Sequence, residues 1–142
     1  MTVTTFYGNP AHDCGGAQVR ARCRQLATVV TISGAIDDSN VDGITDYAKH
    51  FVLAEKPFVL DLSGVSSFAA HGISLLDSLA DDCDAIGVEW RLIASEPVVR
   101  TVSACADPAA IPAAGSVPDA LGEFAELTRS RRRLLPILTK TA

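Results

Sequence analysis

The sequence predicts a single α/β domain in which a mixed, mainly parallel sheet of about five strands is flanked by four helices. The chain has 142 residues, the usual size of one domain. Hydrophobic residues make up 48% of it and charged residues 20%, which is a globular composition. Two strand patterns come first with no room for a helix between them. Helix and strand patterns then alternate, which requires parallel pairing of the later strands.

Five segments have the pattern of β-strands. Residues 17–24 alternate small or apolar residues with polar ones, which predicts a half-buried strand whose arginines face solvent. Residues 27–34 are apolar and β-branched, as expected of a strand buried on both faces. Residues 56–64 and 88–95 have apolar centres, and residues 111–116 form a weak fifth strand.

Four segments are predicted to be helices. Residues 40–53 and about 70–85 place apolar side chains three and four positions apart. Residues 96–106 begin with Glu and Pro, which favour a first helical turn, and residues 117–133 form the last helix. The domain is therefore expected to span residues 17–133.

Both ends of the chain are expected to lie outside this domain. Residues 1–16 contain glycine and proline without an apolar period, which predicts a flexible N-terminal arm. Residues 134–142 form a C-terminal tail whose apolar residues are too few to span a membrane.

Charge and hydropathy exclude several classes of function. The chain has 12 Lys and Arg against 17 Asp and Glu, so its net charge of −5 disfavours nucleic-acid binding. No apolar run reaches the roughly 18–20 residues that cross a bilayer. The first residues also lack the basic and apolar regions of a secretory signal. We therefore expect a cytoplasmic protein with no membrane span.

No catalytic or metal-binding set of residues is recognisable in the sequence. The phosphate-binding glycine loops, the nucleophile elbow and the zinc-protease motif are absent. His12, Cys14 and Cys23 lack the paired spacing of zinc ligands. Asp37 and Asp38 lie where a helix cap is expected, which favours a structural role over acid–base catalysis. We expect no enzyme activity, no metal and no cofactor.

The segment after the strand at 56–64 is the most informative. The predicted strand ends near Leu62 and a helix begins near Ala70, so the loop brings residues 66–71 to the positive end of a helix dipole. This loop lies at the carboxyl edge of a parallel sheet, where ligands and partners bind.

The same segment carries a family motif. It reads DLSGV at residues 61–65, then two serines, Phe68, and AAHGI at residues 69–73. This resembles the STAS domain family of sulfate transporters and anti-sigma factor antagonists, whose pattern is DLSGV, a short spacer and DSSGL opening a helix. SGAID at residues 33–37 resembles the GELD element of that family. The resemblance covers about residues 17–130.

The resemblance implies an anti-sigma factor antagonist, which binds an ATP-binding, kinase-like anti-sigma factor and so releases a sigma factor. The alternative is a STAS-type sensor or scaffold that binds a small ligand, a complex or a transport partner. A homodimer is left open. The residues expected to bind the partner are Asp37, Asp38, Ser39, Asn40, Ser66, Ser67, Ala70, His71, Gly72 and Ser74.

The phospho-acceptor position of the family is not a serine in this chain. Phosphorylated antagonists take the phosphate on the serine after the aspartate of DSSG; Ala69 and Ala70 stand at these two positions. Because Ala70 has no hydroxyl, we expect this switch to be absent and the face to keep its unphosphorylated charge. The same replacement also fits a face that binds a different partner. His71 is either a surface residue or a titrating gate, and the nearby serines are alternative acceptors.

Two cysteines suggest another kind of switch. Cys83 and Cys105 lie in the last turns of two consecutive predicted helices, on the stripes expected to face inward. Neighbouring helix ends could meet the geometry of a disulfide, which makes this pair a candidate redox switch. The alternative is that each is a small buried hydrophobic residue.

An acidic cluster lies near the end of the helix at 70–85. It consists of Asp81, Asp82 and Asp84, at the helix end that a negative charge does not favour. The sequence leaves two interpretations open, a solvated helix face and a surface for a basic partner.

Overall fold

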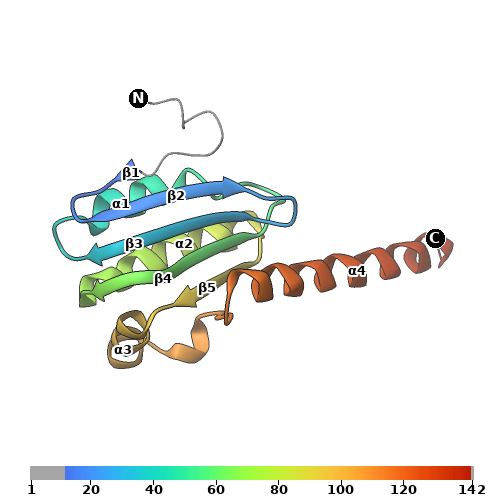
Figure 1. The fold of residues 1–142 in the computed structure, drawn as a ribbon. Helices are drawn as coiled ribbons and strands as arrows, with labels where there is room; N and C mark the ends of the chain where they lie inside the picture. Colours follow the sequence, from blue (N-terminus) through green and yellow to red (C-terminus); the bar gives the residue numbers. More distant parts are fainter. Residues whose placement is uncertain (1–11, 142) are drawn as a thin grey trace.

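The computed structural model describes the backbone of residues 12–141 and the side chains of residues 12–130 except Pro108. Five strands form one sheet, in the order in which they occur in the chain (Figure 1). The strands are β1 (His12–Asp13), β2 (Ala17–Cys23), β3 (Thr28–Ile36), β4 (Phe58–Phe68) and β5 (Trp90–Ala94). β1, β2 and β3 pair antiparallel, whereas β3, β4 and β5 pair in parallel.

In the part of the chain that the structure describes, four helices and two short 3-10 turns connect and cover the sheet. The helices are α1 (Val41–Lys49), α2 (Ile73–Ile86), α3 (Glu96–Cys105) and α4 (Val117–Thr141), and the turns are η2 (Ala70–Gly72) and η3 (Pro108–Ala110). α1 and α2 cover one face of the sheet, and α4 packs on the opposite face (Figure 1). The predicted α/β class, with a mixed five-stranded sheet and four helices, is confirmed.

The fifth strand is not the predicted segment 111–116. That segment makes a single parallel bridge to β5, because Pro112 has no amide hydrogen with which to extend the pairing. The fifth strand of the sheet is instead β1, which lies at the opposite edge and pairs with β2. The chain reverses between these two strands at Gly15 and Gly16, both of which have positive φ. His12 and Asp13, which fall within the predicted arm, therefore belong to the sheet, and residues 14–16 form the turn into β2. The first 11 residues of the predicted arm lie outside the described residues.

The main hydrophobic core lies between the sheet and the helices α1 and α2. Alternate residues of the two central strands point to this face, among them Ile32 of β3 and Leu60 and Leu62 of β4, all fully buried. Ile44 of α1 and Leu79 of α2 meet them from the helical layer. Burial of these apolar side chains is the main stabilising term of the domain.

A second, smaller core lies under the first turns of α4. Ala120 and Phe124 pack on Val29, Val59 and Ile93, which occupy the other face of the three parallel strands. This arrangement explains why the beginnings of β3 and β4 are apolar at consecutive positions, since both of their faces are covered.

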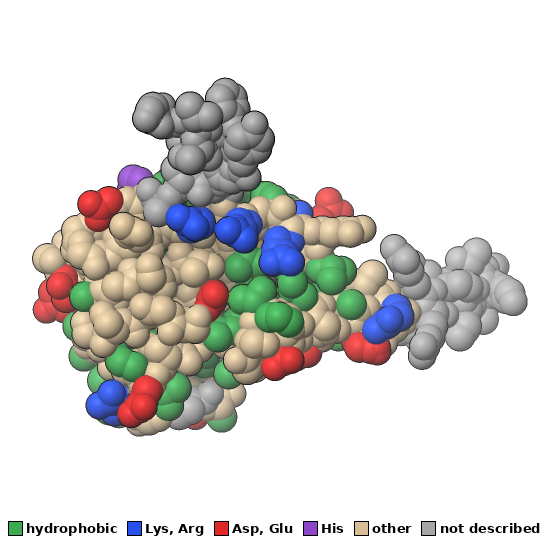
Figure 2. Space-filling view, viewed as in Figure 1, with side chains coloured by type: hydrophobic (Ala, Val, Ile, Leu, Met, Phe, Trp, Pro, Cys, Tyr) green, Lys and Arg blue, Asp and Glu red, His purple; other side chains and the backbone are tan. Residues whose placement is uncertain are grey.

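Beyond this cluster, the second face of the sheet is polar. Ser33 and Ser63 lie further along the parallel strands and are at least partly exposed. Arg20 and Arg22 of β2 are exposed, as the alternation in that strand predicts. Figure 2 shows a row of basic side chains along β2 beside this part of the surface.

α4 is longer than predicted. It does not end at residue 133 but continues through most of the predicted tail to Thr141, and its ribbon extends beyond the edge of the sheet (Figure 1). Within the described part of the chain, no helix combines the length and the hydropathy needed to cross a membrane.

Thr28 is a position at which a substitution should increase the folding stability, because its hydroxyl is buried without a hydrogen-bond partner. Thr28 is 1% exposed, and its Oγ1 is the one buried side-chain oxygen or nitrogen without a hydrogen-bond partner among the described residues. We expect Thr28→Val to raise the free energy of unfolding by about 1 kcal/mol, because it removes an unpaired polar group at nearly constant shape. Urea denaturation measures this change.

Thr45 supplies the matched control. Its hydroxyl is also buried but donates to the Val41 carbonyl at 2.7 Å. Thr45→Val should therefore give no gain, because a satisfied hydrogen bond is lost. Equal effects of the two substitutions would show that the unpaired Thr28 hydroxyl has no energetic cost.

Candidate functional site

The loops that follow β3 and β4 lie side by side at the carboxyl ends of these parallel strands. The Ala69 amide donates to the Ile36 carbonyl at 3.0 Å, which joins the end of β3 to the residue after β4. His71 of η2 reaches across to α1, where its Nε2 lies 3.7 Å from Asp42 Oδ1. We call the exposed residues of these two loops, with the exposed end of β4, the carboxyl-end surface; its members are Asp37, Asp38, Ser39, Ser66, Ser67, Ala70 and His71.

The Asp37 side chain stabilises the first of these loops, which follows β3. Its carboxylate accepts hydrogen bonds from the Ser39 amide and the Ser39 hydroxyl, which makes a turn of the Asx type. The hydroxyl bond and then the amide bond lower the pKa of the Asp37 carboxyl, so it is ionised at neutral pH. The carboxylate thus binds within its own loop, and the first residue before α1, Asn40, makes no side-chain cap of the expected kind.

The Asn40 side chain is largely buried and is hydrogen-bonded within the chain. It is 6% exposed, and its Nδ2 donates to the carbonyls of Gly15 at 3.0 Å and Ala35 at 2.8 Å. Its Oδ1 accepts from the Asp37 amide at 2.9 Å. The side chain therefore holds the β1–β2 turn, the end of β3 and the Asp37 loop together. The predicted contact of Asn40 with a partner stays a prediction, and the structure leaves little of this side chain exposed for it.

Gly72 is likewise buried, so it does not offer a contact surface. A Cβ at this position would lie 2.6 Å from Cζ of Phe68, whose ring fills the space beneath η2. Only glycine allows this close approach of the backbone to the ring. The residue that the family motif places here is thus explained by packing at the start of α2.

The remaining predicted residues differ in accessibility. Ala70 and His71 are exposed on η2. Ser66 and Ser67 are also exposed, but they belong to β4, which runs on to Phe68 instead of ending near Leu62. The Ser74 hydroxyl is partly buried and donates to the His71 carbonyl at 2.8 Å, so it stabilises the first turn of α2.

Two further residues take part in this arrangement that sequence analysis did not single out. Asp42 is exposed and is the carboxylate that lies beside His71. Thr101 of α3 donates its hydroxyl to the Phe68 carbonyl at 2.7 Å, which fixes α3 against the end of β4. Neither residue lies in a recognisable motif, because only the folded chain brings α1 and α3 to these loops.

A shallow pocket of about 310 Å³ adjoins the Asp37 loop. Cys14 and Gly15 line it from the β1–β2 turn, and Ser39 and Gly43 line it from the start of α1. Among the described residues, no group of three His, Cys, Asp or Glu side chains is arranged to hold a metal ion. The chemistry available here is that of a carboxylate-rich surface with hydroxyl and imidazole groups.

The two cysteines of the predicted switch have different environments. Cys83 is fully buried, and burial, followed by the nearby Asp82 charge, raises the pKa of its thiol to about 12. Cys105 is exposed, so the expectation that both cysteines face inward is wrong for Cys105. Both are free thiols in this structure.

Cys83 should therefore be the least reactive described thiol. A rise in thiol pKa from 9.0 to about 12 lowers the thiolate fraction at pH 8 by roughly 1,000-fold. We expect iodoacetamide to modify Cys23 and Cys105, which are exposed, well before Cys83 in the folded protein, as followed by peptide mass spectrometry. Modification of Cys83 at the rate of Cys105, or recovery of a Cys83–Cys105 disulfide after mild oxidation, would contradict this expectation.

Comparisons with known proteins agree with this architecture. The family model of the STAS domain matches residues 18–107. The chain is also 46% identical over 146 residues to Osmosensory protein A of Mycobacterium tuberculosis, with 99% of this chain and 92% of that protein covered.

Two solved structures share the fold at low sequence identity. An anti-sigma factor antagonist from Mycobacterium paratuberculosis has a TM-score of 0.66 and 20% identity, over 77% of this chain and 94% of that chain. RsbS from Moorella thermoacetica has a TM-score of 0.67 and 20% identity, over 78% of this chain and 97% of that chain.

Proposed function

This chain belongs to the STAS domain family, and we propose that it is a non-catalytic anti-sigma factor antagonist. Its partner is an ATP-binding, kinase-like anti-sigma factor, and binding releases a sigma factor for transcription in the cytoplasm. The observation that carries this proposal is the joining of the Asp37 loop and η2 into one exposed surface. The fold that the chain shares with a solved anti-sigma factor antagonist supports it.

Ala70 makes this antagonist independent of phosphorylation at the usual position. A phosphate there would add about −1.5 to −2 charges to a surface that already carries Asp37 and Asp38 and that has Asp42 of α1 beside it. Ala70 is exposed and neutral, so the docking surface keeps one charge state. We propose no redox control through Cys83 and Cys105. Cys83 is buried and Cys105 is exposed, so the two thiols do not share one inward-facing stripe.

A charge placed at Ala70 tests the proposal. We expect Ala70→Glu to weaken binding to an ATP-binding anti-sigma factor of the source organism by at least about tenfold, measured by calorimetry. The matched control is Ala85→Glu, which adds the same charge at an exposed position in the last turn of α2, away from the carboxyl-end surface. The control should bind like the unmodified protein.

Two results would count against the antagonist. One is that no ATP-binding anti-sigma factor of the source organism binds the protein. The other is that Ala70→Glu and Ala85→Glu bind equally well, which would show that the partner docks elsewhere. Circular dichroism of both variants establishes that each has folded.

The second candidate function is a STAS-type sensor. The observation that favours it is the 46% identity to a protein named for osmosensing. A sensor of this kind would couple a stimulus or a small ligand to a partner protein. Native mass spectrometry that finds a bound small molecule, with no anti-sigma factor binding, would favour this candidate over the antagonist.

A further inference from the structure

Three exposed arginines follow one another along β2 and just beyond its end. Arg20, Arg22 and Arg24 occupy alternate positions, and none of them forms an ion pair with another described residue. We call these three residues the basic row; Figure 2 shows the basic side chains along β2. The described cations of the helices and of β5 are instead paired with carboxylates: Lys49, Arg91, Arg100 and Arg129.

The basic row lies on the face of the sheet opposite to α1 and α2. The buried residues of β2 alternate with Arg20 and Arg22 and point into the core under these helices, so the two arginines point away from it. Asp61 of β4 shares this face, but the pairing of Arg20 with Thr31 and of Thr31 with Asp61 places it two strands from Arg20. Its carboxylate accepts from the Ser63 amide at 3.0 Å. The row therefore keeps its positive charge.

α2 carries the complementary charges on its outer side. Asp77, Asp81 and Asp84 are exposed at intervals of four and three residues, which places them along one side of the helix. None of the three forms an ion pair with another described residue, whereas Asp82 is paired with Lys49 of α1 at 3.8 Å. We call Asp77, Asp81 and Asp84 the acidic stripe.

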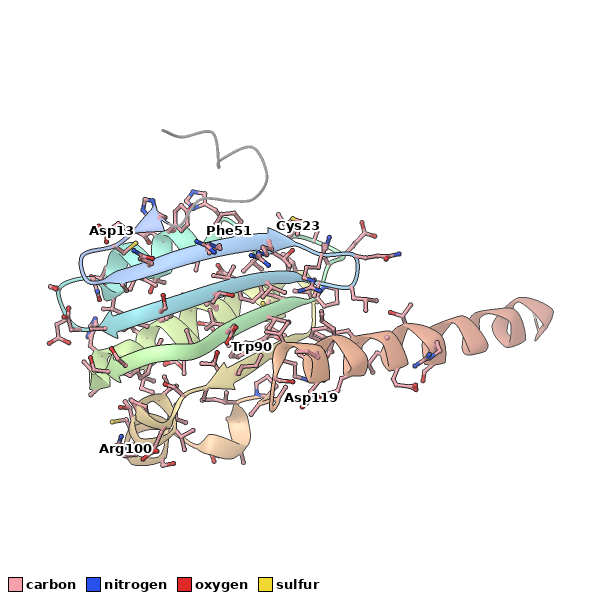
Figure 3. All side chains as sticks on the ribbon, viewed as in Figure 1. Asp13, Cys23, Phe51, Trp90, Arg100 and Asp119 are labelled. Atoms are coloured by element: carbon pink, nitrogen blue, oxygen red, sulfur yellow. The ribbon has the colours of Figure 1, made fainter. Side chains whose placement is uncertain are left out.

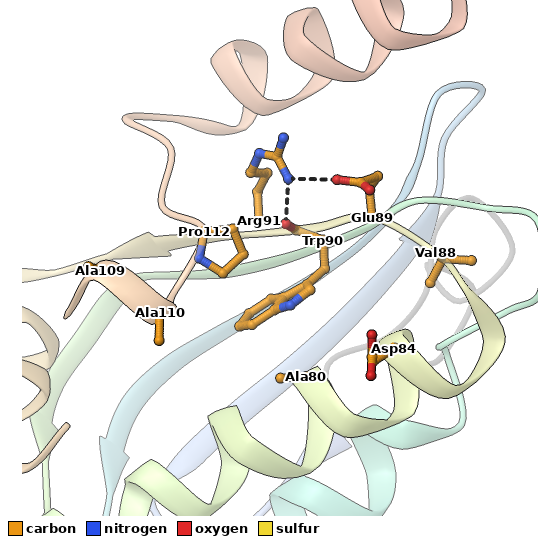
Figure 4. A pocket seen from close by; sticks show the side chains of 9 residues that line it. All are labelled: Ala80, Asp84, Val88, Glu89, Trp90, Arg91, Ala109, Ala110 and Pro112. Carbon is orange, nitrogen blue, oxygen red and sulfur yellow. Dashed lines mark hydrogen bonds and ion pairs between the residues drawn. The ribbon is translucent and has the colours of Figure 1, made fainter. Parts of the chain in front are cut away.

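The surroundings of Asp84 show why the domain does not neutralise this stripe itself. Asp84 lines a pocket of about 360 Å³ at the end of α2, and Arg91 lines the same pocket (Figure 4). The Arg91 Nε lies 2.8 Å from Glu123 Oε1, and its Nη1 lies 3.5 Å from Glu89 Oε1. Because this guanidinium faces two other carboxylates, Asp84 remains available to a cation from outside the chain.

The basic row and the acidic stripe lie on opposite sides of the sheet, so they do not meet within one copy of the chain. Their dimensions are similar. Alternate residues of a strand lie about 7 Å apart, and helix residues three or four positions apart lie about 4.5–6 Å apart along the axis. We propose that the acidic stripe of one copy docks on the basic row of a second copy. Because two different surfaces meet, the contact is head-to-tail and repeats from copy to copy.

This proposal gives the acidic residues of α2 their basic partner, which is another molecule of the same protein. Exposed ion pairs contribute little individually and are screened by salt, so the association is weak and depends on ionic strength. We expect sedimentation equilibrium at about 0.5 mM protein to give a mean mass well above that of the monomer in about 20 mM salt, and the monomer mass in about 0.5 M salt.

A charge exchange tests the contact. Arg22→Glu and Asp81→Arg each place a like charge at the centre of the contact, so each single variant should be monomeric in low salt. The double variant that carries both substitutions restores opposite charges and keeps the net charge of −5, so it should associate like the unmodified protein. Arg100→Glu is the matched control, because it reverses an exposed charge on α3 outside both surfaces.

The possible results are distinct, and circular dichroism establishes that each variant has folded. Association that is lost in both single variants and recovered in the double variant supports the proposal. A monomeric unmodified protein in low salt overturns it, as does a double variant that stays monomeric. A monomer that instead binds phosphatidylserine vesicles through Arg22 also overturns it, and assigns the basic row to an anionic lipid surface. None of these measurements uses an anti-sigma factor, so the result is independent of the antagonist proposal.

Discussion

A Gly34→Ala variant is expected to lose at least about 3 kcal/mol of folding stability. Gly34 has a φ of 97°, which side-chain-bearing residues rarely adopt. A Cβ there would overlap the Gly16 carbonyl oxygen and lie 3.1 Å from the Ala17 Cα. That carbonyl accepts the Ala35 amide at 3.0 Å, so the backbone cannot move away without losing this bond. Urea denaturation and the melting temperature measure the loss.

Gly122 provides the matched control for this substitution. It lies in α4, and a Cβ there would have no atom within 4 Å. Gly122→Ala should stabilise the protein by about 0.5–1 kcal/mol, because alanine favours a helix and restricts the unfolded chain. If Gly34→Ala and Gly122→Ala had similar stabilities, the close approach of β2 to Gly34 would be refuted.

Phe124→Ala is expected to cost about 3–5 kcal/mol, the usual range for removing a fully buried aromatic side chain. Phe124 is 1% exposed and holds α4 on Val29, Val59 and Ile93. Its ring also lies under the Arg91 guanidinium, at 5.3 Å from the ring centroid. Equilibrium unfolding followed by circular dichroism measures the loss of stability and any loss of helix.

Phe124→Leu tests whether the volume of the ring matters, because leucine keeps an apolar side chain at this position but a smaller one. It should cost only about 1–1.5 kcal/mol, because leucine fills part of the same space. Binding of an anti-sigma factor by this variant should be unchanged, since α4 packs near the start of the strands and not on the carboxyl-end surface. Equal destabilisation by Ala and Leu would show that α4 is not held by the volume of this ring.

The elements with a strong periodic pattern were predictable from the sequence. Val29 and Val30 are consecutive apolar residues because the beginning of β3 is covered on both faces, and this signal is local. β1 has only two residues and no period, and it becomes a strand because a turn at Gly15 and Gly16 brings it beside β2. Residues 111–116 have a strand-like composition, but a single bridge to β5 is all that they form.

The meeting of the two loops was predictable from the sequence, but the direction of their side chains was not. The motif correctly brings Asp37 and Ala70 to neighbouring loops. It does not show that Asn40 points inward, because the carbonyls that it binds come from distant parts of the chain. Cys105 was misplaced for a related reason: α3 packs at the end of the sheet, and its last turn is left exposed.

Figure 3 shows that side chains with oxygen and nitrogen atoms occur over the whole of the described domain. The three hydrogen bonds of Asn40 and the bond between Ala69 and Ile36 hold the loops of the carboxyl-end surface before any partner arrives. Association then costs little conformational entropy on this side of the complex. A surface that is rigid in advance retains more of its contact energy as affinity. Under the proposed function, a modest interface can therefore suffice, and most of the adjustment on binding falls to the partner.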